Sequence, residues 1–187
     1  MRSILLAMLF LALAHPIASA AGPDRADRAS RRALAAIRER ARVAPAGTVR
    51  LYEPRIDELG AEVDLAAMRQ EALVASRLAV EFGLEARSLM RERARVASRW
   101  SELMIARTLD ANARRPISLE QILGLRRDGL AWTRIAVGLG LRPVQFASAV
   151  RAEARAAIGL EAPDGRVHVI GPLEPDTRVA SAPVAGS

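Results

Sequence analysis

The chain of 187 residues contains no cysteine and no lysine, few aromatic residues and only two histidines. The absence of cysteine excludes disulfides, Cys-based metal clusters and cysteine nucleophiles, so a stable domain must rely on an ordinary apolar core. His15 precedes a possible cleavage site, which leaves His168 as the single imidazole of a processed chain. A Ser-His-Asp triad is therefore disfavoured, because only His168 could supply its imidazole. We expect no catalytic residue, no metal and no cofactor.

Every basic side chain is arginine, and 28 basic residues stand against 21 acidic ones, which gives a formal net charge of +7. The planar fork of arginine grips two phosphate oxygens at once and would suit phosphate recognition. A genome rich in G and C also favours arginine, together with the alanine that is abundant here, and is the simpler explanation. The charge thus indicates a general affinity for anionic surfaces and no specific ligand.

The first twenty residues have the pattern of an export signal. Arg2 precedes an apolar run over Ile4–Ala14, and the small residues Ala18–Ala20 offer a peptidase site. The run is shorter than the roughly 20 residues that a spanning helix needs, which favours a cleaved signal peptide over residues 1–20 against a membrane anchor or a buried N-terminal helix. No later stretch is apolar enough to span a membrane. These features predict a periplasmic or secreted protein.

Residues 21–60 are expected to form a basic N-terminal arm and a linker. Asp24–Val43 is a charged helix candidate with a thin apolar strip, which predicts a solvated helix or a partly disordered arm; binding to an anionic membrane is the alternative. Over Ala44–Leu59 helicity is expected to break, with Thr48–Tyr52 as a short strand or an extended linker. The breakers are Pro45, Gly47 and Pro54.

Residues 61–159 carry helical periodicity and predict an all-α domain, a small helical bundle. Over Glu62–Phe82 apolar residues recur three or four apart and predict one helix that ends at Gly83, with its stripe against the core or, alternatively, along a dimer seam. The stripe consists of Leu65, Met68, Ala72, Ala75, Ala79 and Phe82. Shorter helices are expected at Glu85–Arg93, Trp100–Ala113, Ser118–Arg127, Ala131–Leu139 and Pro143–Ile158.

Capping and turn-forming residues support these helix boundaries. Ser118, followed by Glu120 and Gln121, has an N-cap signature, and Gly129 and Gly140 stand where tight turns require positive φ. Residues 160–187 hold many Pro and Gly and few large apolar residues, which predicts a disordered C-terminal tail. Within it, Arg166–Ile170 alternates and could pair with the strand candidate near residue 50, although two strands alone are marginal.

The two tryptophans fall in similar contexts. Trp100-x-x-Leu103 matches Trp132-x-x-Ile135 at an offset of 32, and the preceding segment matches at an offset of 33. Each copy predicts a short helix, a tight turn and a second helix that opens with a buried Trp, so the bundle should contain two helix-turn-helix-like corners. The pairs at offset 33 are Leu84 with Ile117, Leu89 with Ile122, Met90 with Leu123 and Arg93 with Arg126.

Two resemblances rest on these residues. Ile122–Gly140 is similar to a helix-turn-helix of the resolvase or sigma-factor kind, through Ile122-x-x-Leu125, Gly129, Trp132, Ile135-Ala136 and Leu139-Gly140. Val80–Leu141 resembles a group of uncharacterised exported bacterial proteins with F-G-V, G-[YW]-G-E-L and L-R-x-x-G-x-G-W-G-x-I-A-x-x-L-G segments, which implies a helical fold and an envelope address but no chemistry. The chain departs from the glycines of that group at Arg99, Ser101, Ala131 and Thr133.

The best reading is therefore a non-catalytic exported module that binds an unidentified protein or an anionic envelope component, or has a structural role there. The alternative is a DNA-binding helix-turn-helix protein, which export and a mostly apolar recognition helix disfavour. An enzyme using carboxylates such as Glu62, Asp64 or Glu102 is the third reading, disfavoured because these are ordinary helix-surface positions. Candidate binding residues are Trp100, Glu102, Trp132, Arg126, Arg127 and Arg134; the sequence leaves the oligomeric state open.

Overall fold

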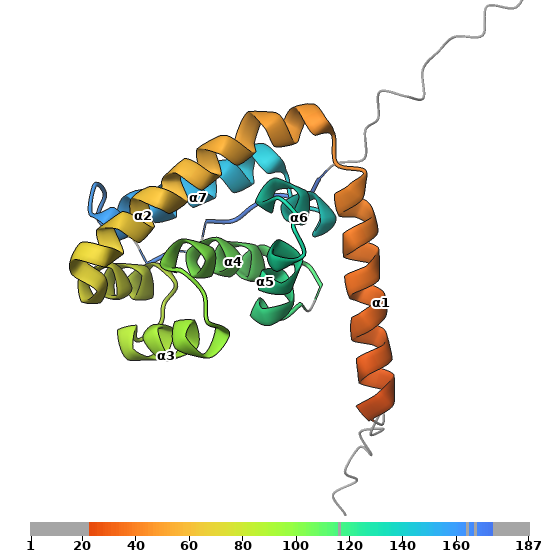
Figure 1. Cartoon of the computed structure of the whole chain (residues 1–187), viewed down its shortest axis with the longest axis horizontal. Coiled ribbons are helices and arrows are strands. Elements are labelled where there is room, and N and C mark those ends of the chain that lie inside the picture. The colour runs from red at the N-terminus through yellow and green to blue at the C-terminus, as the bar shows by residue number, and fades with distance from the viewer. Residues whose placement is uncertain (1–22, 116, 164, 167, 174–187) are drawn as a thin grey trace, which may run out of the picture.

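A computed structural model describes residues 23–115, 117–163, 165–166 and 168–173, and this part of the chain forms seven helices and no strand (Figure 1). The predicted all-α class is confirmed. The expected signal peptide and the last residues of the tail lie outside the described residues. The helices are α1 (Pro23–Arg42), α2 (Ala46–Glu81), α3 (Ala86–Val96), α4 (Trp100–Asn112), α5 (Leu119–Arg127), α6 (Trp132–Gly138) and α7 (Pro143–Ile158).

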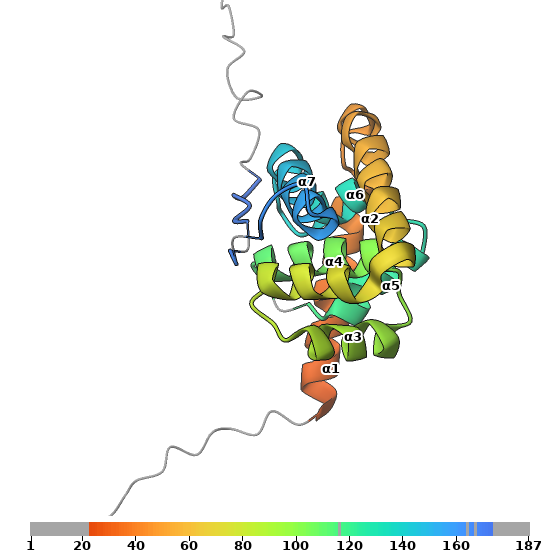
Figure 2. The same ribbon diagram turned by 90° about the vertical axis from the view of Figure 1, so that its left-hand side faces the viewer.

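The bundle is built around the pairing of α2 with α7, which lie side by side in both views (Figures 1 and 2). Helix α4 packs beneath this pair, and the α5–α6 corner lies beside α4. The core holds large side chains from every layer, including the fully buried Leu78, Met104 and Phe146. Alanines on the buried faces of α2 and α7 permit a close approach of the two helix axes. Within the described residues, no helix combines the length and the apolar character that crossing a membrane requires.

Helix α2 occupies the segment for which a linker was predicted. It begins directly after Pro45 and continues through Pro54, so the prediction that Thr48–Tyr52 is extended is wrong. A proline inside a helix costs about 3 kcal/mol or more. Here Ile56 and Leu59, two and five residues further on, are buried, and their burial offsets that cost. The domain boundary expected at residue 61 falls inside this helix.

A kink divides α2 into two halves. Gln70 has φ −145° and ψ 61°, outside the helical region, so the buried face changes there. Before the kink the apolar stripe of the sequence faces solvent, and Leu65 and Met68 are 49% and 85% exposed. After it, Ala75 and Ala79 are buried as predicted. The expectation that the whole stripe faces the core is thus wrong for its first half.

Helix α1 is part of the packed structure, whereas a solvated helix or a disordered arm was expected. Ile37 and Ala41 are buried, and α1 lies against α6 (Figure 1). Gly138 makes this approach possible, because a Cβ there would lie 2.6 Å from the carbonyl oxygen of Ile37. The thin apolar strip is sufficient because glycine brings the partner backbone within contact distance.

The segment after α7 returns along the body instead of leaving it. Ile170 is buried, its amide donates to Asn112 Oδ1 at 2.6 Å, and Leu173 N donates to Gly140 O at 2.7 Å. The predicted tail thus contacts the body over residues 168–173, where it forms neither a helix nor a strand. One buried apolar side chain and side-chain amide partners hold a segment that is otherwise poor in apolar residues. Its proposed pairing with Thr48–Tyr52 does not occur, because that segment is helical.

Candidate functional site

Each tryptophan is the first residue of the second helix of a corner, as the repeat predicts. Trp100 opens α4 and Trp132 opens α6, and the two residues are 4% and 2% exposed. The guanidinium carbon of Arg93 lies 5.0 Å from the Trp100 ring centroid, and that of Arg126 lies 5.1 Å from the Trp132 ring. The matched positions of the sequence repeat therefore perform matched packing roles, with a cation over each buried indole.

Two carboxylates of α2 accept hydrogen bonds from the N-terminal amides of these helices. Glu53 accepts from the backbone amides of Trp132 at 2.7 Å and Thr133 at 2.8 Å, and from the Thr133 hydroxyl at 2.8 Å. Asp64 accepts from the amide of Ser101 at 2.9 Å and from its hydroxyl at 2.7 Å. Negative charge at a helix N-terminus is favourable because the unpaired amides and the helix dipole are positive there.

The side chains of Ser101 and Thr133 add to this capping, because both hydroxyls bind the α2 carboxylates. Glu53 and Asp64 were not singled out as partners by the repeat because they lie on a different helix. Their separation by eleven residues, three helical turns, is a signal that could have found them.

Arg126, a predicted binding residue, is neutralised by acidic partners. One Nη atom of its guanidinium lies 3.0 Å from Glu53 Oε1 and the other 3.0 Å from Asp57 Oδ1. Burial raises the pKa of Asp57, the neighbouring charge of Glu53 raises it further, and Arg126 opposes both effects. Arg126 thus stabilises an internal acidic pair and is not presented to an outside phosphate.

The other predicted residues have local structural roles. Glu102 accepts from the backbone amide of Arg99 at 3.1 Å and so pairs an amide at the start of α4. Arg127 donates to the carbonyl of Val96 at 2.6 Å. Arg134 donates to the carbonyls at the C-terminal end of α1, at 3.1 and 2.9 Å. Three of the six predicted residues, Glu102, Arg126 and Trp132, line one small hollow of about 260 Å³. Trp100, Arg127 and Arg134 do not line it, so the six do not form one site.

The presumed recognition helix of the helix-turn-helix is enclosed. Helix α6 packs against α1, α2 and α7, and its buried side chains include Thr133. Thr133 and Arg134, the two polar readers expected on this helix, bind Glu53 and the end of α1. A recognition helix must present polar side chains to the major groove, and α6 does not do so.

A solvent-open hollow lies between α2 and the first corner, beside Trp100. Its cavity volume is about 610 Å³. Met68 and Arg69 contribute exposed side chains from α2, while Trp100 forms part of the wall. We call this hollow the Met68 cleft; its lining consists of Asp64, Ala67, Met68, Arg69, Glu71, Arg93, Arg99 and Trp100.

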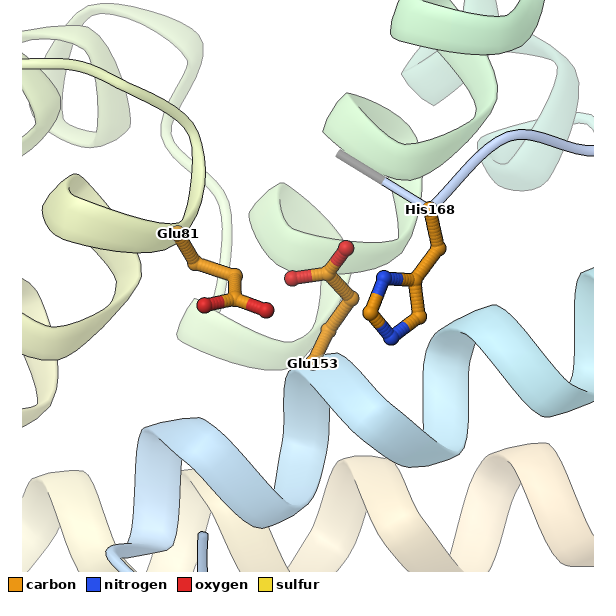
Figure 3. Close-up of side chains that lie close together, drawn as sticks. All are labelled: Glu81, Glu153 and His168. Atoms are coloured by element: carbon orange, nitrogen blue, oxygen red, sulfur yellow. The ribbon is translucent and has the colours of Figure 1, made fainter. Parts of the chain in front are cut away.

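A different set of ionisable side chains meets near the far end of α2. Glu81 ends α2, Glu153 lies on α7 and His168 lies on the returning C-terminal segment, and the three side chains point toward one another (Figure 3). One ligand atom from each lies within 4.8 Å of the others. Among the described residues, this group has the composition and spacing to hold a metal ion. The sequence did not indicate it, because the three residues come from distant segments.

Comparison of the chain with protein-family models, with curated proteins and with solved structures finds no match. The resemblance to exported bacterial proteins therefore stays a prediction.

Proposed function

We propose that this protein is a non-catalytic helical module exported to the cell envelope, where the Met68 cleft binds an anionic lipid surface. The single observation behind this proposal is the exposed apolar and cationic rim of the cleft. Met68 is 85% exposed at a position where the helical period would normally bury it. Leu65, one turn earlier, is 49% exposed.

The arginines of the cleft suit an anionic surface. Arg69 is exposed on α2. Arg99, from the corner across the cleft, has a side chain that is 66% exposed, although it also pairs with Glu102 at 3.1 Å and with Asp64 at 3.8 Å. A peripheral membrane site combines a few inserted apolar side chains with cations that face the headgroups. Each such cation contributes about 1 kcal/mol at an anionic bilayer. The net charge is +7 for the whole chain and +6 once Arg2 is removed with residues 1–20, and it adds long-range attraction to the same surface.

Export and binding are tested separately. For export, a C-terminally tagged full-length chain is expressed, fractionated and sequenced from its mature N-terminus. The proposal expects envelope or secreted material that begins near Ala21. Intact Met1 protein recovered from the cytosol would overturn export and would reopen the DNA-binding alternative, which a salt titration against duplex DNA then decides.

For binding, the purified mature chain is sedimented with phosphatidylglycerol vesicles and with phosphatidylcholine vesicles. We expect binding to the anionic vesicles that weakens with salt, and a loss of roughly tenfold or more in Arg69→Glu and Met68→Glu. Arg151→Glu and Val144→Glu on exposed α7 positions are matched controls for charge and hydrophobicity and should stay close to wild type.

Three outcomes would contradict the cleft. Equal losses in Arg69→Glu and Arg151→Glu would show non-specific attraction to the whole basic chain. Absence of binding to either vesicle would remove the lipid surface as the ligand. A self-association that Met68→Glu abolishes, seen by sedimentation velocity, would assign the same surface to a second copy of the chain.

A further inference from the structure

Two of the three residues in Figure 3 are acidic side chains placed in the interior. Glu81 is 2% exposed and Glu153 is 0% exposed, and both carboxylate oxygens of Glu153 are shielded from solvent. Such burial is rare for glutamate, because an ionised carboxylate loses its hydration. Two adjacent carboxylates also repel each other when ionised, which favours a cation close to both.

We propose that Glu81, Glu153 and His168 bind one divalent transition-metal ion, with Zn²⁺ as the representative of the class. Two ionised carboxylates match the charge of a divalent cation. The imidazole selects the class of metal, because zinc and its neighbours accept mixed nitrogen and oxygen ligands, whereas Mg²⁺ and Ca²⁺ favour oxygen alone.

The spacing of the ligand atoms suits this class. A zinc ion holds nitrogen and oxygen ligands at about 2.0–2.2 Å, which places tetrahedral ligand atoms roughly 3.4 Å apart. The three candidate atoms lie within 4.8 Å of one another, so binding requires a contraction of at most roughly 1.5 Å per pair. Rotation of glutamate side chains covers such a distance without moving the helices.

His168, the third candidate ligand, lies on a segment that is hydrogen-bonded to Asn112. The carbonyl of His168 accepts from Asn112 Nδ2 at 2.9 Å, and the amide of Ile170 donates to Oδ1 of the same side chain at 2.6 Å. Asn112 therefore holds the backbone on both sides of residue 169 and fixes where the imidazole enters the cluster. A supported backbone of this kind is what a metal site needs for a defined geometry.

This site is independent of the Met68 cleft, since no residue is shared and either can fail without the other. Three protein ligands also leave one tetrahedral position for water or an exchangeable ligand.

The test uses the purified mature chain, stripped with chelator and titrated with ZnCl₂ by calorimetry, with the bound metal counted by elemental analysis after dialysis. We expect one zinc ion per chain and little competition from a large excess of Mg²⁺. At zinc 100-fold above the dissociation constant, the Tm should rise by about 5–10 °C. Absence of stoichiometric zinc, or equal affinity for Mg²⁺, would overturn the proposal.

Variants separate this site from adventitious zinc. Glu153→Gln and His168→Gln should each weaken binding by about 100-fold or more, because even partners outside the coordination shell change affinity 10–100-fold. The exposed Glu62→Gln is the matched control and should bind like wild type. Zinc binding that persists unchanged in both site variants would overturn the assignment.

Misfolding of the variants is excluded by a measurement without metal. Circular dichroism and the metal-free Tm establish that Glu153→Gln is folded, and the rise of its Tm with zinc should then disappear. If Glu153→Gln does not fold, His168→Gln is used for the test instead, because the His168 side chain is only partly buried.

Discussion

Glu53 on α2 accepts a hydrogen bond from the backbone amide of Trp132 at 2.7 Å, so one helix supplies the N-terminal cap of another that follows it by some eighty residues. Asp64 does the same for the amide of Ser101 at the start of α4. Neither capped helix has a capping side chain of the usual kind immediately before it, since Arg99 and Ala131 occupy those positions. Long-range capping thus fixes both corners onto α2.

Glu53→Ala should destabilise the protein by roughly 2–4 kcal/mol, because it removes a helix cap and leaves Arg126 beside Asp57 alone. Asp64→Ala should cost less, about 1–2 kcal/mol, because its capping partners are fewer. Urea unfolding at pH 7 measures both values. Glu62→Ala, on an exposed face of the same helix, is the control; a Glu53→Ala effect no larger than that of the control would contradict long-range capping.

Both indoles should report an interior environment in solution. In Trp100→Phe the remaining Trp132 is expected to emit at short wavelength and to resist acrylamide quenching, because its ring is 2% exposed. Trp132→Phe should give a similar result for Trp100. Red-shifted emission that is readily quenched in either variant of the folded protein would show an indole displayed to solvent and would restore a ligand-stacking role.

Gly138→Ala should separate α1 from α6. The new methyl would lie 2.6 Å from the carbonyl oxygen of Ile37, a backbone atom that cannot move without shifting α1. We expect a loss of about 1–3 kcal/mol and faster proteolysis within α1. Gly124→Ala is the matched control, since nothing lies within 4 Å of its added Cβ. It should be neutral or stabilising by up to about 1 kcal/mol. Equal behaviour of the two variants would contradict the close packing of α1 on α6.

Glu120→Gln should lower the free energy of unfolding near neutral pH and leave it unchanged in acid. A backbone hydrogen bond at the start of α5 lowers the pKa of Glu120 most, and hydrogen bonds from Arg95 and Ser118 lower it further. A carboxyl whose pKa is lower in the folded state adds stability above its unfolded value, and that stability is lost as the pH falls through the folded value. The expected difference is a few tenths of a kcal/mol because the side chain is exposed. Urea unfolding should show it at pH 7 and show it vanish as the pH falls below 4.5; a difference independent of pH would contradict this origin.

Local patterns in the sequence predict the helical class. They also predict the helices from residue 84 onward and the residues that cap and separate them. Ser118 caps α5 together with Gln121, and Gly129 and Gly140 have φ of +87° and +81°, as their positions predict. Pro143 begins α7, where its missing N–H costs nothing. These features depend on neighbours within one turn, which a single sequence displays directly.

The errors arise where distant contacts override local preference. Proline disfavours a helix interior, yet burial of Ile56 and Leu59 carries α2 through Pro54. Periodicity placed Met68 in the core because the kink at Gln70 has no local signal. The cluster of Glu81, Glu153 and His168 depends on three segments that meet only in the folded chain.

The docking of α1 on α6 joins elements separated by nearly one hundred residues of sequence. A chain that emerges N-terminus first, from a ribosome or through a membrane pore, therefore presents its first helix long before the surface that receives it exists. Contacts of such sequence separation slow folding, and the unpaired apolar strip around Ile37 is open to wrong partners during that interval. Assembly of this protein is completed only when its last third has arrived, which makes α1 the element that a holding chaperone would have to protect.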